Sequence, residues 1–304
     1  MKTIDLIDMK YSVDGKPTKL PYSKQPGENY TLFLEGDSHV GNIGIDDKKI
    51  DSLVKAVKSK KNAFVINMGD NLEAINVKDV RYSLAVHGCR GSMVQAQRDS
   101  FIERFDTIGD RFLNVTDGNH ELKFKNDFKP NADIAKQFGS VYVDGTMSKL
   151  IFPEFRICAW HGAGNVSSSS GDELQRKTNE LIALKRKLRK LPANDCEIMA
   201  MGHVHKLLLH LPTDRLIAST DREKLDITAH YSKPGRIDID KDRGLYRIHD
   251  DDKYYIGTGS FLKGYIEGVS TYVEEMGLGM TELGWVEIEV KNGKPCDIVM
   301  RKSL

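Results

Sequence analysis

The stretch RFLNVTDGNHE, from Arg111 to Glu121, joins an apolar segment to a cluster of polar side chains. Its β-branched and aromatic residues predict a buried strand that ends in a turn at Gly118. Glycine lets a backbone turn sharply and approach a ligand closely. After it, Asn119 offers an amide oxygen and His120 an imidazole, both able to bind a metal ion, and Glu121 can orient either one. The stretch therefore predicts a strand with side chains able to bind a metal ion at its carboxyl end.

Length and composition describe an ordinary water-soluble globular protein. The chain has 304 residues, of which 39% are hydrophobic and 29% charged. The net charge of +1 argues against a protein that is held on nucleic acid mainly by bulk charge. No linker, repeat or low-complexity tract divides the sequence, so we expect one domain over residues 1–304.

The same data bear on the compartment. The first ten residues contain no long apolar segment of a signal peptide. No window approaches the roughly 20 apolar residues that span a bilayer, so no membrane association is expected. Four scattered cysteines without CxxC spacing predict reduced thiols rather than a disulfide framework. The expected location is cytoplasmic.

Four further buried strands end at polar residues in the same way. They are predicted at 30–34, 63–68, 148–160 and 196–201, and a short strand at 141–143 ends without such a cluster. The polar residues that follow the four strands are Asp37 with His39, Asp70, His161, and His203 with His205.

Helices are predicted between most of these strands. Asp46 can cap a helix that runs to about residue 60, and a capping box at 170–173 begins a long one. Other helices are expected at about 72–86, at 94–108, and from Asn131 to a glycine stop at Gly139. Residues 1–29 suggest a small hairpin or extended arm, and 285–300 a hairpin that turns at Asn292. This order indicates an α/β fold with two packed sheets flanked by helices.

The five polar clusters can converge in space. Each gap between them suits one strand plus a crossover, and ligands of open α/β sheets collect at the carboxyl ends of strands. Carboxylate, amide and imidazole ligands without cysteine suit Mn²⁺, Fe or Zn²⁺. The ligands are too many for one ion, but two ions sharing a bridging carboxylate would use them all. Such pairs act on the attacking and leaving oxygens of a displacement at phosphorus.

Together these motifs resemble the calcineurin-like metallophosphoesterase family. That family carries D-x-H, G-D, G-N-H-E/D, H and G-H-x-H in this order. Here they are Asp37-Ser-His39, Gly69-Asp70, Gly118-Asn-His-Glu121, His161 and Gly202-His-Val-His205. The resemblance implies a four-layer α/β/β/α sandwich of two mixed β-sheets flanked by helices. The motif core would span residues 30–210, and strands in 211–304 would complete the second sheet and a cap.

The resemblance also implies a role for each position. One metal ion would be held by Asp37, His39 and His205, and a second by Asn119, His161 and His203. Asp70 would bridge both ions. His120 would be the general acid, and a metal-bridging hydroxide the nucleophile. The resemblance favours Mn²⁺, with Fe and Zn²⁺ as alternatives.

Departures from the family pattern reduce the number of activities that the resemblance implies. The second motif lacks the Asp-Arg-Gly run of protein phosphatases, and Glu73 stands where purple acid phosphatases place a tyrosine ligand. A compact phosphodiesterase is therefore expected, acting on a phosphodiester such as a nucleotide or nucleic acid. The segment 257–264 resembles the tail of phage and bacterial repair-exonuclease-like members, so a DNA or RNA nuclease is the alternative. A third reading is a protein-binding scaffold with a vestigial metal site.

Residues outside the motifs are less informative. His87 and Arg90 could contact substrate, although an ordinary loop is the favoured interpretation. The basic run 185–190 could bind nucleic acid, but cations also suit a helix C-terminus, and a solvated helix face is the favoured interpretation. Glu121 is left either as a residue that orients a ligand or as a solvated loop residue.

Overall fold

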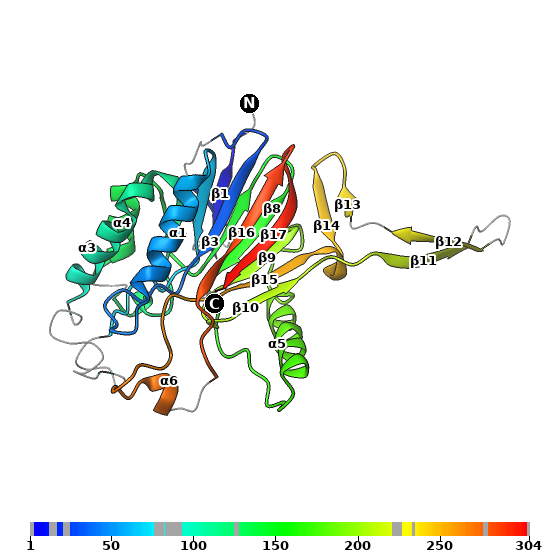
Figure 1. Ribbon diagram of the computed structural model, residues 1–304. Coiled ribbons are helices and arrows are strands. Elements are labelled where there is room, and N and C mark those ends of the chain that lie inside the picture. The colour runs from blue at the N-terminus through cyan, green and yellow to red at the C-terminus, as the bar shows by residue number, and fades with distance from the viewer. Residues whose placement is uncertain are drawn as a thin grey trace.

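The computed structural model describes residues 3–11, 17–20, 25–75, 82, 93–124, 128–220, 227–232, 235–275 and 279–302. Within these residues two mixed β-sheets pack face to face, and helices cover their outer faces. Figure 1 shows the resulting layers, with α1, α3 and α4 on one side and α5 on the other. The α/β sandwich expected from the sequence is confirmed.

The first sheet has six strands, and its central strands are parallel. In order across the sheet they are β17 (Lys294–Lys302), β16 (Gly284–Lys291), β3 (Tyr30–Glu35), β4 (Ala63–Asn67), β5 (Phe112–Thr116) and β6 (Val141–Val143). Strands β3 to β6 run parallel to one another, whereas β16 is antiparallel to both of its neighbours. The carboxyl ends of β3, β4 and β5 therefore lie at one edge of the sheet.

The second sheet has seven strands. In order they are β10 (Leu207–His210), β15 (Tyr254–Thr258), β9 (Ile198–Met201), β8 (Arg156–Trp160), β7 (Met147–Ile151), β1 (Asp5–Tyr11) and β2 (Pro17–Leu20). Strands β15, β9 and β8 are parallel, and the other pairings are antiparallel. Two separate two-stranded sheets follow β10: β11 (Arg215–Thr220) with β12 (Ile227–Ser232), and β13 (Arg236–Asp240) with β14 (Leu245–Ile248). The β11–β12 pair projects away from the body (Figure 1).

Strand β3 shows how the layers are built. All six of its residues are buried, as expected for a strand covered on both faces. Leu32 and Leu34 face the core between the two sheets, whereas Phe33 faces the core beneath the helices. Successive side chains of a strand point to opposite faces, so this apolar run serves two cores at once.

Four helices lie where the sequence predicts them, with small shifts at their ends, and a fifth, short helix is not predicted. They are α1 (Asp47–Ser59), α3 (Val94–Phe105), α4 (Pro130–Phe138), α5 (Glu173–Leu188) and the short α6 (Tyr272–Glu275), with 3-10 turns at Asp106–Arg111, Glu121–Phe124 and Asp250–Asp252. Asp46 caps α1 by accepting a hydrogen bond from the Lys49 N–H at 3.0 Å. Gly139 ends α4 in the left-handed conformation.

Some predictions are corrected by the structure. The segment 148–160 is a hairpin of β7 and β8 rather than one strand, because Pro153 cannot donate to a ladder. The cap of α5 is Asp172, not Ser170. Helix α4 begins one residue earlier, at Pro130, a residue that suits the first turn. The described parts of the predicted helix 72–86, Leu72–Ile75 and Tyr82, are not helical.

The strands after residue 211 also differ from expectation. Strand β15 joins the seven-stranded sheet, but β16 and β17 extend the six-stranded sheet beside β3. The turn between β16 and β17 has Asn292 and Gly293 at positive φ, as the predicted hairpin requires. At the other end of the chain, β1 and β2 form the predicted hairpin, and β1 also pairs with β7. In the described part of the chain, no helix combines the length and apolarity needed to cross a membrane.

Candidate metal centre

Five strand ends supply the side chains of the candidate site. Three of the strands, β3, β4 and β5, belong to the six-stranded sheet, and two, β8 and β9, belong to the seven-stranded sheet. The loop after β3 carries Asp37 and His39, and the loop after β4 carries Asp70. Asn119 and His120 follow β5, His161 follows β8, and His203 and His205 follow β9. The site therefore lies where the carboxyl ends of strands from both sheets meet.

The backbone at these strand ends adopts an uncommon conformation. Asp37, His39, Asp70, His203 and His205 all have φ between 48° and 66°. Non-glycine residues rarely adopt this region, which costs of order 1–3 kcal/mol for each residue, and such strain gathers at functional sites. Backbone hydrogen bonds hold it in place, among them Asp37 N–H to Gly69 O at 2.9 Å and His39 N–H to Asp70 O at 3.0 Å.

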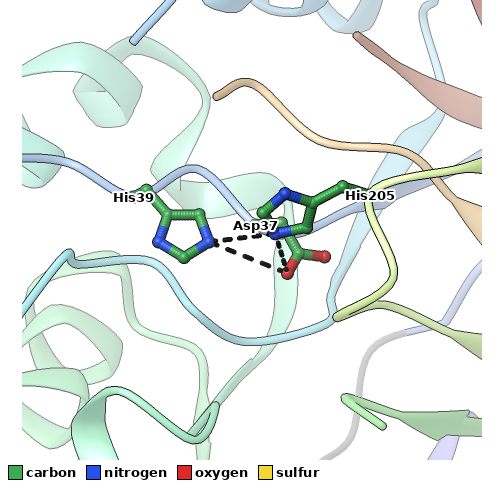
Figure 2. A group of neighbouring side chains, drawn as sticks. All are labelled: Asp37, His39 and His205. Carbon is green, nitrogen blue, oxygen red and sulfur yellow. Dashed lines mark hydrogen bonds and ion pairs between the residues drawn. The ribbon is translucent and has the colours of Figure 1, made fainter. Parts of the chain in front are cut away.

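Asp37, His39 and His205 form the first group that could bind a metal ion (Figure 2). The two Nε2 atoms of His39 and His205 lie 3.2 Å apart, and Asp37 Oδ1 lies 3.3 Å from His205 Nε2. Asp37 Oδ1 is buried and makes no hydrogen bond with the described residues. A buried carboxylate oxygen without such a bond, facing two imidazole nitrogens, fits a cation site better than a structural ion pair.

Asp70, His161 and His203 form a second group. Asp70 Oδ2 lies 3.3 Å from His161 Nε2, and Asn119 Oδ1 lies 3.0 Å from the same nitrogen. The rings of His161 and His203 are 5.1 Å apart and nearly perpendicular. Asp70 Oδ2 is also 3.8 Å from His39 Nε2, so Asp70 lies between the two groups.

His120 belongs to a third group, with His39 and Asp70. Its Nε2 is 3.9 Å from Asp70 Oδ2, and its Nδ1 is 2.5 Å from the Glu73 carbonyl oxygen. A carbonyl only accepts hydrogen bonds, so Nδ1 carries a proton and Nε2 faces Asp70. This arrangement suits the proton-donating role expected from the sequence, but it also places His120 within reach of an ion.

Charges in the metal-free site compensate one another. Burial opposes a charge on His39 and His161, but the carboxylates around them outweigh burial and raise each pKa to about 9. Burial also opposes ionisation of Asp70, yet the facing histidines hold its pKa well below its usual range. In contrast, burial and the neighbouring His161 lower the pKa of His203 to about 4. The raised pKa values of His39 and His161 thus favour positive charge beside the buried carboxylates.

Gly118 explains why the stretch that opens the sequence analysis needs a glycine. A Cβ atom at this position would overlap Asp70 Oδ1 and crowd the Asp70 backbone nitrogen. The close approach lets the loop after β5 reach the loop after β4, where Asp70 Oδ1 accepts a hydrogen bond from the His120 N–H at 3.0 Å. The glycine therefore allows the loops after β4 and β5 to pack together, in addition to allowing the turn.

The structure shows the role of Glu121, for which the sequence left two interpretations open. Its Oε1 accepts a hydrogen bond from the Leu72 N–H at 2.9 Å, and its Oε2 accepts one from the Gly118 N–H at 2.8 Å. Burial, together with Asp70, raises the Glu121 pKa to about 8. Glu121 is thus neither solvated nor aimed at an ion; it joins the loops after β4 and β5.

Sequence reasoning missed two groups of supporting residues. Glu73, noted only as a departure from one subfamily, has its Oε2 at 3.0 Å from His39 Nδ1. Beneath the site, Asn67 bonds to Asn71 at 2.6 Å, and Asn71 bonds to Asn131 at 3.1 Å. The sequence indicates only the start of a helix at Asn131. The signal for Glu73 was its place three residues after Asp70, where a side chain can turn back towards the loop after β3.

The remaining candidates from the sequence are two possible substrate contacts and the basic run 185–190. His87 and Arg90 lie outside the described residues. The basic run at the end of α5 is partly paired, because Lys185 Nζ lies 2.8 Å from Asp251 Oδ1 and Arg189 Nε lies 2.6 Å from Asp250 Oδ2. Two cations of the run thus pair with acidic side chains, whereas the sequence predicts a solvated helix face.

Comparisons with known proteins give weak likenesses only. No family model and no curated protein matches the sequence. Among solved structures, Vps29 from Chaetomium thermophilum is 11% identical with a TM-score of 0.32, covering 90% of this chain and 95% of that one. A proposed 5'-nucleotidase from Staphylococcus aureus is 13% identical with a TM-score of 0.34, covering 67% of this chain and 53% of that one. The NAD nucleotidase NadN from Haemophilus influenzae is 13% identical with a TM-score of 0.36, covering 90% of this chain and 49% of that one. This chain thus spans about half the length of the two nucleotidases, and such likenesses do not establish its activity.

Proposed function

We propose that this chain is a metal-dependent phosphodiesterase. The observation that carries the proposal is the set of three overlapping His and Asp groups, of which two share Asp70 and two share His39. In this proposal one ion is held by Asp37, His39 and His205, and a second by Asn119, His161 and His203, with Asp70 shared between them. The donor set of carboxylate, amide and imidazole groups suits Mn²⁺, with Fe and Zn²⁺ as alternatives.

When bound, two such ions would supply an activated water and offset the charge that develops on the phosphoryl group. The protein's own residues prepare the site for that chemistry. Asp37 and Asp70 are held ionised by the facing histidines despite their burial, and His203 is neutral at pH 7. In its protonated form, His120 presents Nε2–H to the leaving oxygen while the Glu73 carbonyl holds Nδ1.

The nuclease alternative rests on the segment 257–264, and the structure gives that segment a different role. Ser260 Oγ donates a hydrogen bond to the Asp37 carbonyl oxygen at 2.9 Å, and the Phe261 N–H donates to the same oxygen at 3.1 Å. These contacts hold Asp37 in its uncommon backbone conformation. Support of the loop that carries Asp37 is compatible with either activity, and a compact phosphodiesterase remains our first proposal.

The domain organisation is also a proposal. We infer that residues 1–304 form one domain, supported by pairing between distant parts of the chain. Strand β16 pairs with β3, and β15 pairs with β9. One core between the sheets contains Leu6 near the N-terminus and Ile288 near the C-terminus. Limited proteolysis tests this: release of a stable fragment that keeps its own thermal transition would contradict it.

A metal and substrate screen tests the proposed function. Purified protein is stripped with EDTA, reloaded with Mn²⁺ and assayed on bis(p-nitrophenyl) phosphate, p-nitrophenyl phosphate, cyclic nucleotides, RNA and linear DNA. We expect hydrolysis of the aryl diester that disappears with EDTA and returns with Mn²⁺. His120→Ala prepared in parallel excludes a contaminating enzyme. Preferential cleavage of DNA or RNA would favour the nuclease. Activity that survives complete metal removal would refute the proposal, and a protein that binds no metal would favour the scaffold.

A further inference from the structure

Glu73 contacts two histidines of the candidate site by two different routes. Its side-chain Oε2 lies 3.0 Å from His39 Nδ1, and its main-chain oxygen lies 2.5 Å from His120 Nδ1. Glu73 is buried, with 3% of its surface exposed. One residue therefore faces both a proposed metal ligand and the proposed proton donor.

These contacts determine how each imidazole presents its second nitrogen. A carboxylate and a carbonyl oxygen are both acceptors, so the Nδ1 atoms of His39 and His120 must act as donors. This leaves each Nε2 directed at Asp70 Oδ2, at 3.8 Å for His39 and 3.9 Å for His120. The centroids of the two rings lie 4.8 Å apart and the rings are nearly perpendicular, so the two imidazoles pack edge to face.

The main chain at Glu73 is held independently of its side chain. The Glu73 N–H donates to the Val40 carbonyl oxygen at 2.9 Å. The next residue, Ala74, has φ of 50°, and its N–H donates to Gln97 Oε1 on α3 at 2.8 Å. The carbonyl that meets His120 should therefore keep its place when the Glu73 side chain is replaced, which makes the two contacts separable.

We propose that Glu73 is a positioning residue that aligns both histidines, its carboxylate orienting His39 for metal binding and its carbonyl orienting His120. The inference rests on the proposed function, because it assigns His39 to a metal ion. Outer partners of metal-binding histidines typically contribute 10–100-fold to metal affinity. The effect of the side chain should fall on the ion held by His39 and not on the ion held by His161 and His203.

Calorimetric titration of metal-free protein with Mn²⁺ tests the side-chain contact. We expect Glu73→Ala to weaken one of two binding events by roughly 10–100-fold and to leave the other within about threefold of wild type. Glu73→Gln keeps an acceptor oxygen and should recover most of the lost affinity. Glu287→Ala is the matched control, because Glu287 is equally buried on β16 but pairs with Trp285 and Arg301. It should lower the melting temperature without changing Mn²⁺ affinity.

A second readout does not depend on metal binding or activity. In ¹⁵N-histidine-labelled, metal-free protein, the Nδ1–H protons of His39 and His120 should be hydrogen-bonded and slow to exchange with water. Assignment comes from His39→Gln and His120→Gln. In Glu73→Ala the His39 signal should be lost while the His120 signal stays.

The outcomes separate this inference from the proposed function. Unchanged Mn²⁺ affinity in Glu73→Ala, or an equal loss in Glu287→Ala, would overturn the role of the carboxylate. Retention of the protected His39 proton in Glu73→Ala would overturn it as well. Wild-type protein that binds no Mn²⁺ would contradict the proposed function and the metal-binding role of His39. In that event the exchange experiment still decides whether Glu73 orients the two rings.

Discussion

Metal binding to this site should release protons, and the number can be worked out from the structure. His39 and His161 have pKa values of about 9, so at pH 7 each is protonated in roughly 99 of 100 molecules. His203 is already neutral, with a pKa of about 4. An imidazole must lose its proton to bind an ion. Because each proposed ion meets one protonated histidine, loading both ions should release about two protons from these residues.

The same pKa values predict the direction and the size of the pH dependence of metal affinity. A raised histidine pKa keeps the competing proton bound below about pH 9, so metal affinity should be weakest in acid and rise with pH. Each ion's association constant should increase about tenfold per pH unit between pH 6.5 and 8, or about 1.4 kcal/mol per unit. The increase should level off near pH 9, where both histidines become neutral without metal.

The assay is calorimetric titration with Mn²⁺ at fixed pH in two buffers that differ in ionisation enthalpy. The difference in observed heat gives the number of protons released. His161→Gln should reduce that number by about one, whereas His210→Gln, on β10 outside the metal-binding groups, should not change it. Release of less than half a proton for two bound ions, or an affinity constant from pH 6.5 to 8, would refute the reasoning.

Three further outcomes are expected. His120→Ala should keep the metal content of wild type but lower kcat on an aryl diester by about 10²–10⁴-fold, and unchanged turnover would remove His120 from the reaction. Asp70→Ala should lose both metal ions and all activity, so metal content equal to wild type by elemental analysis would contradict a shared ligand. In metal-free protein, the raised pKa values of His39 and His161 should contribute stability that is fully present below the ordinary histidine pKa and is lost as pH rises to about 9. Thermal denaturation followed by circular dichroism measures this loss. A melting temperature that stays constant from pH 6.5 to 9 would contradict those pKa values.

The strands and the candidate residues at their ends were predictable because both signals are local. A buried apolar run such as 30–34 has few alternatives to a strand, and polar residues directly after it must lie at its carboxyl end. Parallel strands then bring those ends together, as the structure does for His39 and Asp70. The fold class followed from the same alternation of strands and helices.

The supporting residues could not be predicted because their roles depend on contacts between distant segments. Glu73 acts across 34 positions on His39, and Asn71 bonds to Asn131 across 60. Neither residue belongs to a periodic pattern. Glu121 was likewise ambiguous, since a buried brace and a solvated loop residue have the same local sequence. The hairpin within 148–160 was missed because its apolar residues continue on both sides of a single proline.

The candidate ligands come from both sheets, and this has a mechanical consequence for the whole molecule. Ions held jointly by residues after β3, β4 and β5 and by residues after β8 and β9 would fasten the two halves of the sandwich together at one edge. At a free concentration 100 times Kd, one such ion adds about 2.7 kcal/mol to the free energy of unfolding. The supply of metal would then govern how long the folded protein survives as well as how fast it works.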